Sequence, residues 1–152
     1  MKDFCIIGSG ISGATIANSL SKKYSLDVYD KARGAGGRSS NKKLSKNESF
    51  DHGVQYISPK STQFKKFIKN LLTKKIVKKW PGKHLFLNTD KKEDKKHIKI
   101  IGKKGNNAIS KYLLKDINCN FNSEVIKIFN KNKVWEISFS DGSTKFYKSL
   151  IL

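Results

Sequence analysis

Arginine is nearly missing from this chain, although the chain is strongly basic. The 152 residues carry 32 Lys and Arg against 12 Asp and Glu, a formal charge of +20, yet arginine occurs only at Arg33 and Arg38. The other 30 basic residues are lysines, spread from Lys2 to Lys148. Proteins that read nucleic acids favour arginine, whose planar guanidinium fits phosphates and guanine edges. The composition therefore disfavours a nucleic-acid partner, although the charge keeps a basic nucleic-acid-binding module as an alternative.

Cysteines and long apolar runs are also scarce. Cys5 and Cys119 lie far apart and form no CxxC pair, which excludes a disulfide framework and favours a cytoplasmic location. No run reaches the ~20 apolar residues that span a membrane, so we expect no membrane partner. His52, His84 and His97 do not have the spacing of metal ligands, and no metal is predicted.

Two apolar runs flank a glycine-rich turn at the start of the chain. Residues 3–8 and 26–30 are predicted to be buried parallel strands, and residues 11–23 an amphipathic helix. The turn, Gly8-Ser9-Gly10-Ile11-Ser12-Gly13, has GxGxxG spacing. Its glycines allow a tight turn, a close approach to a pyrophosphate and close packing of the helix, whose first N–H groups face the phosphates. This pattern predicts a dinucleotide-binding βαβ unit.

An acidic residue follows the second strand, where a dinucleotide-binding unit needs one. Asp30 lies 17 residues beyond Gly13. A carboxylate at this point accepts hydrogen bonds from ribose hydroxyls and repels a 2′-phosphate. Asp30 therefore disfavours NADP in this site.

The loop after Asp30 indicates which dinucleotide is bound. It contains Gly36-Gly37-Arg38, and both arginines of the chain lie between positions 33 and 38. An NAD-only domain needs no such loop, whereas a second loop can close on the diphosphate of an extended FAD. The sequence therefore favours FAD, with surface ion pairs as the alternative role of the arginines.

The rest of the chain mixes helices and strands. Residues 50–57 alternate in polarity, and the chain stops inside the apolar run 149–152, which leads us to expect a truncated domain. The further expected elements are helices over 61–73 and 106–114, and strands over 76–80, 84–87, 98–101, 124–129, 134–139 and 145–152.

Several motifs resemble one family. Residues 30–38 look like the flavin fingerprint of the amine-oxidase superfamily, and residues 50–56 (FDHGVQY) look like a motif of its renalase-like branch. Residues 102–108 are also similar, although the family usually has methionine where Asn106 stands. The resemblance covers the whole chain but only about the first half of a family member.

The resemblance implies a fold, a domain division and a reaction. The fold would be α/β: a Rossmann-type FAD/NAD(P)-binding domain with an inserted α+β part of a substrate domain. Residues 1–56 and 106–152 would form the incomplete FAD-binding domain, and residues 57–105 part of a substrate-binding domain. The reaction would be hydride transfer to the flavin from a small-molecule substrate, an amine or a reduced dihydropyridine such as a nicotinamide. An incomplete FAD-binding fragment without turnover is the alternative.

The expected cofactor site combines the two glycine loops with the renalase-like motif and one later strand residue. Gln55 could hydrogen-bond the flavin or be an ordinary exposed residue, and no catalytic side chain is predicted because the flavin carries the redox chemistry. The predicted cofactor-binding residues are Gly8, Ser9, Gly10, Ile11, Ser12, Gly13, Asp30, Lys31, Arg33, Gly37, Arg38, Gly53, Val54, Gln55, Tyr56 and Val125.

Overall fold

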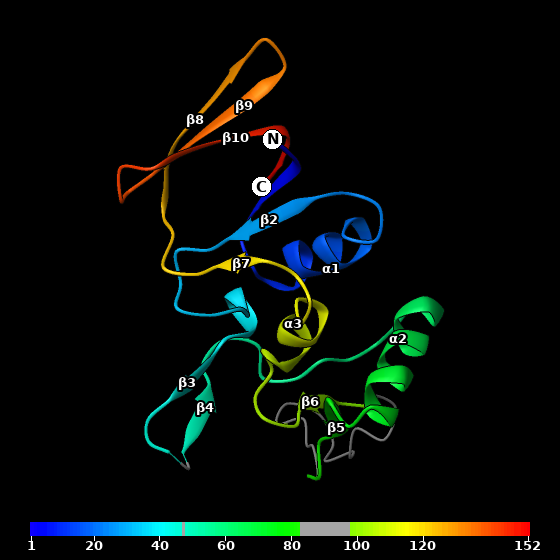
Figure 1. Cartoon of the computed structure of the whole chain (residues 1–152). Helices are drawn as coiled ribbons and strands as arrows, with labels where there is room; N and C mark the ends of the chain where they lie inside the picture. Colours follow the sequence, from blue (N-terminus) through cyan, green and yellow to red (C-terminus); the bar gives the residue numbers. More distant parts are fainter. Residues whose placement is uncertain (47, 83–97) are drawn as a thin grey trace, which may run out of the picture.

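A six-stranded sheet organises the chain in a computed structural model, which describes residues 1–46, 48–82 and 98–152 (Figure 1). The strand order is β7-β2-β1-β10-β9-β8. The strands of this sheet are β1 (Lys2–Ile7), β2 (Leu26–Tyr29), β7 (Cys119–Asn120), β8 (Val125–Lys131), β9 (Val134–Phe139) and β10 (Thr144–Ile151). The remaining elements are α1 (Ile11–Leu20), the 3-10 turn η1 (Gly37–Ser39), β3 (Asn41–Lys43), β4 (Ser49–Asp51), α2 (Thr62–Thr73), β5 (Val77–Lys79), β6 (Ile100–Gly102) and α3 (Ala108–Leu113).

The sheet is parallel at one end and antiparallel at the other. β1 pairs in parallel with β2 and with the second half of β10, and β2 pairs in parallel with β7. The first half of β10 pairs instead with β9, and β9 with β8, both antiparallel. The predicted α/β class with a Rossmann-type parallel sheet is therefore confirmed.

Both faces of β1 are buried, as its apolar run predicts. Ile6 packs with Ala14 and Ala17 of α1 and with Ile109 of α3 in one cluster. Cys5, the next residue back along the strand, is fully buried in a second cluster on the β8–β10 side. Its burial raises the pKa of the thiol to about 12, so Cys5 is a core residue.

One buried polar network ties the second cluster to the sheet. Asp27 of β2 accepts hydrogen bonds from the Lys2 ammonium at 2.6 Å, the Asn118 amide at 2.5 Å and the Tyr147 hydroxyl at 2.8 Å. Burial alone would raise the pKa of Asp27, but these three donors outweigh it and lower the pKa. Tyr29 completes the network through a 2.7 Å contact between its hydroxyl and that of Tyr147.

The segment between β2 and α3 departs most from the sequence prediction. Of the run 50–57, only residues 50 and 51 join a strand, which pairs in a hairpin with residues 41–43 that the sequence analysis did not predict. Residues 53–56 belong to no strand, and the backbone of Val54 is hydrogen-bonded to Arg38 and Asn106 instead. The expected strand over 84–87 and the histidines at 84 and 97 lie outside the described residues.

The other predicted elements form, with shifted ends. The helices are shorter than expected at one or both termini, and the two-residue strand β7 was not predicted. Ser61 is the N-cap of α2, since its hydroxyl accepts a 3.2 Å hydrogen bond from the Phe64 N–H. Among the described residues, the helices all fall short of the length and apolarity that crossing a bilayer requires.

Candidate functional site

The glycine-rich turn and α1 are packed too tightly for any larger residue at position 13. A Cβ atom added to Gly13 would lie 2.0 Å from the Gly8 carbonyl oxygen. The helix therefore begins directly on the turn, with Gly10 as an N-cap that makes no side-chain hydrogen bond. The first N–H groups of α1 are left free of partners within the helix, which favours an anion at this point.

The second glycine loop lies against the first. Gly36 forms a parallel bridge with Gly10, and its N–H donates to the Ser9 carbonyl at 3.1 Å. Gly37 has φ of +52°, and a Cβ atom there would lie only 3.2 Å from the Gly10 Cα. The two loops, separated in the sequence by β2, thus meet backbone to backbone.

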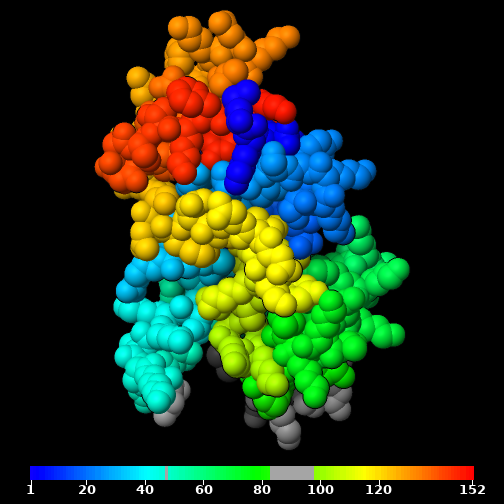
Figure 2. Space-filling view, in the orientation of Figure 1, coloured from blue at the N-terminus to red at the C-terminus, as the bar shows by residue number. Residues whose placement is uncertain are grey.

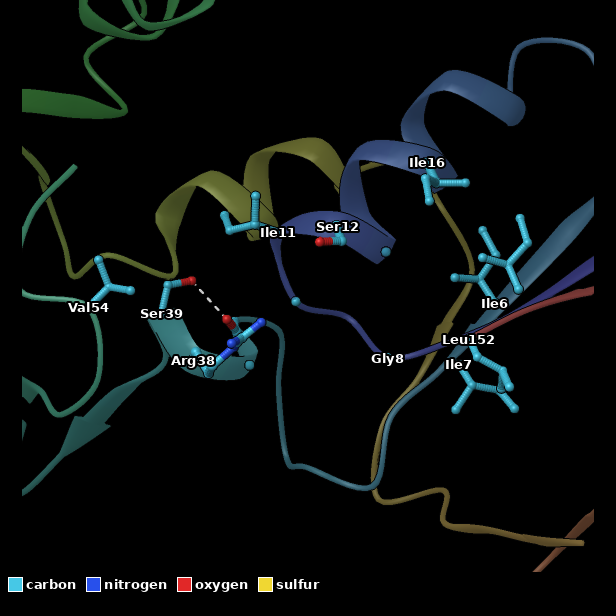
Figure 3. Close-up of a pocket in the computed structure, with 15 residues that line it drawn as sticks. Ile6, Ile7, Gly8, Ile11, Ser12, Ile16, Arg38, Ser39, Val54 and Leu152 are labelled. Carbon is cyan, nitrogen blue, oxygen red and sulfur yellow. Dashed lines mark hydrogen bonds between the residues drawn. The ribbon is translucent and has the colours of Figure 1, made fainter. Parts of the chain in front are cut away.

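A hollow of about 590 Å³ opens between these loops (Figure 3). Arg38 is the one charged residue that lines it, and its guanidinium makes no hydrogen bond or ion pair with any described residue. In Figure 3 Ile11 and Ser12 at the start of α1 and Val54 lie around the same space as Arg38. The glycines, the helix terminus and one free arginine make this an anion-accepting hollow.

Asp30 lies beside a second hollow that continues the first. This hollow, about 280 Å³, shares Ile7 and Gly8 with the larger one. Asp30 and Lys31, which directly follow β2, and Val125, at the start of β8, all line it. Glu124 adds a second carboxylate, which the sequence analysis missed.

The Asp30 carboxylate also holds the first glycine loop. One of its oxygens accepts from the Ser9 N–H at 2.7 Å and from the Ser9 hydroxyl at 2.5 Å, and the other accepts from the Ala32 N–H at 2.8 Å. A carboxylate has about four acceptor positions, so capacity for a further donor remains. Ser9 itself is fully buried.

A third hollow, largely apolar, adjoins the first on its other side. Its volume is about 470 Å³, and it shares Ile11, Ser39 and Val54 with the glycine-loop hollow. Phe64 and Phe67 of α2 supply aromatic surface to it. The three hollows form a row from a polar acidic end to an apolar end.

Residues 50–56 contribute one residue to the lining of these three hollows. Val54 lines both larger hollows, whereas Gly53, Gln55 and Tyr56 line none of the three. Gln55 is exposed, and the Tyr56 ring packs on Trp80 with 5.6 Å between centroids. Of these four predicted residues, the structure therefore places only Val54 in the lining of the site.

Asn106 fixes this motif, and the sequence analysis assigned it no role. Its side chain is fully buried and donates to the carbonyls of Val54 at 2.6 Å and Gln55 at 3.1 Å, while its oxygen accepts from the Gly102 N–H at 2.8 Å. Its backbone N–H donates to Asp51 at 2.9 Å. The one feature of the sequence that could have pointed to this role is the amide at position 106, where the family that the chain resembles usually has methionine.

The two arginines lie in different places. Arg38 lines the glycine-loop hollow, whereas Arg33 lines a separate hollow of about 550 Å³ beside Lys111 and Cys119. Ile151 and Leu152 at the end of β10 line the glycine-loop hollow although they were not predicted. The sheet topology could have predicted these two residues, because ligands of parallel α/β sheets bind at the carboxyl ends of the strands.

Within residues 1–46, 48–82 and 98–152, no group of three His, Cys, Asp or Glu side chains could hold a metal ion. His52 contacts the Ser40 hydroxyl through Nε2 at 2.9 Å, at an exposed position.

Comparison with known proteins agrees with this geometry. Residues 6–71 match the family model of the NAD(P)-binding Rossmann-like domain. The fold is therefore that of a Rossmann-type α/β domain.

Solved structures share the fold at low sequence identity. Tetracycline destructase Tet(51) is 19% identical with a TM-score of 0.63, and Tet(55) is 12% identical with a TM-score of 0.65. A protein of Photorhabdus luminescens subsp. laumondii, described as an FAD-containing monooxygenase, is 19% identical with a TM-score of 0.63. Each match covers 99% of this chain but only 37–38% of the other one. The chain therefore spans little more than a third of the length of these proteins.

Proposed function

We infer that this chain binds FAD in the row of hollows and serves as the FAD-binding part of an oxidoreductase. The observation that carries the proposal is the contact between the two glycine loops, which leaves the start of α1 and the free guanidinium of Arg38 facing one hollow. Such a hollow suits a diphosphate.

The neighbouring hollows suit the two ends of FAD. Two carboxylates, Asp30 and Glu124, and one cation, Lys31, line the smaller one, so a ribose with free hydroxyls is favoured there and a 2′-phosphate is disfavoured. The apolar hollow beside Val54 offers a dry surface for a flat ring. NAD would use only part of such a row, which is why we propose FAD.

The residues of this chain would bind and orient the cofactor and exclude water from it. FAD, when bound, supplies a two-electron acceptor for a hydride from the substrate. We propose a reaction of the renalase or amine-oxidase type, on an amine or a reduced dihydropyridine, from the resemblance of residues 30–38 and 50–56. In this scheme residues 57–105 contribute part of the substrate domain, and residues 1–56 and 106–152 hold the cofactor.

Oxygen insertion is a second candidate reaction, because one of the solved structures is described as an FAD-containing monooxygenase. A fragment that binds FAD without turnover is a third candidate, since the matched proteins are much longer. Anaerobic mixing of the FAD-loaded chain with NADH, and separately with an amine, separates turnover from the fragment, because bleaching shows that the bound flavin accepts a hydride and unchanged absorbance with both reductants supports the fragment. Oxygen insertion is distinguished by admitting labelled O2 to the reduced chain, since only a monooxygenase incorporates one of its atoms into an organic product.

The cofactor itself is tested by titrating the chain into FAD and following flavin fluorescence. Arg38→Gln and Arg33→Gln remove the same charge from two different hollows and form a matched pair. We expect Arg38→Gln to weaken FAD binding about tenfold, since a charge-assisted hydrogen bond to phosphate is lost, and Arg33→Gln to change it less than about twofold. A wild-type chain that leaves FAD fluorescence unchanged would refute the proposal, and equal losses in both variants would refute the assignment of the site.

A further inference from the structure

A strongly basic hollow lies outside the row described above. It has a volume of about 450 Å³ and is formed where the turn after α2, the turn before α3 and α3 itself meet. Five of its nine lining residues are lysines, and none is acidic. These lysines are Lys75, Lys103, Lys104, Lys111 and Lys115.

A second hollow continues the first around α3. It has a volume of about 550 Å³, shares Lys111 with its neighbour and contains Arg33, again with no acidic residue in the lining. The segments concerned lie next to one another on the face shown in Figure 2, where yellow-green atoms meet green and yellow ones. We refer to the two hollows together as the α3 groove.

Within the described part of the chain, the positive charges of the α3 groove are unpaired. The side-chain nitrogens of its five lysines and of Arg33 make no hydrogen bond or ion pair with any residue that the structure describes. Elsewhere the chain does pair its lysines, as Lys2 with Asp27 and Lys148 with Asp3 show. Like charges around a concave surface raise the local potential and attract anions.

One buried polar group in the groove also lacks a partner. The side-chain oxygen of Asn107 is buried without a hydrogen bond from any described residue, and Asn107 lines the first hollow while being only 7% exposed. Buried polar atoms are nearly always satisfied in folded proteins, so an unsatisfied one points to a missing ligand or water. The Asn107 amide nitrogen can donate to a phosphate oxygen, whereas the unsatisfied oxygen can accept from a water or a lysine ammonium beside such a ligand.

We propose that the α3 groove binds a small anion with at least two phosphate groups, such as pyrophosphate or the phosphate chain of a nucleotide. Six cations spread over two adjoining hollows exceed what a single phosphate can neutralise. Lysine binds phosphate as a point charge and needs no planar partner. The groove consists of two hollows of small-molecule size, which favours a compact ligand over a nucleic-acid strand.

The test is calorimetric titration of the full chain with inorganic pyrophosphate and with ATP at fixed salt. The triple variant Lys103→Gln, Lys104→Gln, Lys111→Gln removes three charges from the groove. The control variant Lys127→Gln, Lys131→Gln, Lys133→Gln removes three charges from the β8–β9 hairpin. All six side chains are exposed, so both triple variants are expected to fold, which circular dichroism verifies.

We expect the groove variant to bind both ligands more than about tenfold more weakly and the control variant to differ less than about twofold from wild type. Equal affinity of pyrophosphate and ATP would mean that the phosphates alone are recognised, and tighter ATP binding would mean that the nucleoside contributes. Both results would support the proposal that the α3 groove binds the phosphates. Equal losses in the two triple variants would overturn it, since net charge would then explain the binding.

Two further experiments distinguish anion binding in this groove from anion binding at other sites. If Arg38→Gln abolishes pyrophosphate binding while the groove variant retains it, the anion sits at the glycine loops and the inference fails. A single-stranded oligonucleotide that displaces pyrophosphate more effectively than ATP at equal phosphate concentration would overturn the proposal in favour of nucleic acid. The FAD titration has separate readouts, so the two proposals can fail independently.

Discussion

At the scale of single residues, the carboxylate of Asp30 stabilises the first glycine loop through Ser9 and also borders the hollow proposed for a ribose. The acid at the end of β2 therefore has a structural function before any ligand binds. Asn106 acts similarly, because one buried side chain holds the backbone of both Val54 and Gln55. The shape of the site depends on such polar contacts as much as on the glycines.

Replacing Asn106 tests this view. Asn106→Ala leaves the Gly102 N–H and the carbonyls of Val54 and Gln55 without their partner, and we expect a loss of about 2–4 kcal/mol in the free energy of unfolding. Amide hydrogen exchange in residues 53–57 should accelerate more than in β1. Exchange that rises equally in both segments would mean that Asn106 only stabilises the chain as a whole.

Asp27 makes stability depend on acid pH. Its pKa is lowered in the folded chain, so it stabilises the fold above the unfolded value of about 3.9, and this contribution is lost as the pH falls further. Asp27→Asn should cost about 2 kcal/mol at pH 7 in urea unfolding, and the difference from wild type should shrink at pH 3. A difference that stays the same at both pH values would contradict this role.

At the scale of elements, α1 depends on contact with the turn that precedes it. Gly13→Ala introduces a Cβ that would lie 2.0 Å from the Gly8 carbonyl oxygen, so the helix must shift. We expect a loss of about 2 kcal/mol or more in the free energy of unfolding, as overpacking usually costs about 1–3 kcal/mol. Ser19→Gly, at an exposed position of the same helix, changes helix propensity alone, at a cost of under about 1 kcal/mol, and serves for comparison. A smaller loss for Gly13→Ala than for Ser19→Gly would contradict the packing argument.

The start of α2 offers a simpler test. Ser61→Ala removes the N-cap hydrogen bond to the Phe64 N–H, and we expect about 1 kcal/mol of destabilisation. Ser61→Asp should retain stability, because aspartate also caps helices and interacts favourably with the helix N-terminus. Thermal unfolding of both variants measures the effect, and equal melting temperatures for Ala and Asp would argue against the cap.

At the scale of the whole molecule, the sequence predicts the first βαβ unit well and the later assembly less well. The glycine turn, α1 and Asp30 follow from local spacing, so pattern alone is enough to find them. That Gly37 would touch Gly10, that Arg33 and Arg38 would line different hollows, and that Asn106 would hold Val54 depend on how distant segments pack. Residues 53–56 alternate like a strand but gain no ladder partner, since contacts with Asn106 and Arg38 occupy their backbone.

The most direct test of the account is a map of backbone amide chemical shifts as FAD is added to the full chain. The account predicts the largest changes at Gly10, Ile11, Ser12 and Gly37, and smaller ones at Ala32 and Val125. No changes at the two glycine loops would contradict the claim that these loops hold the cofactor.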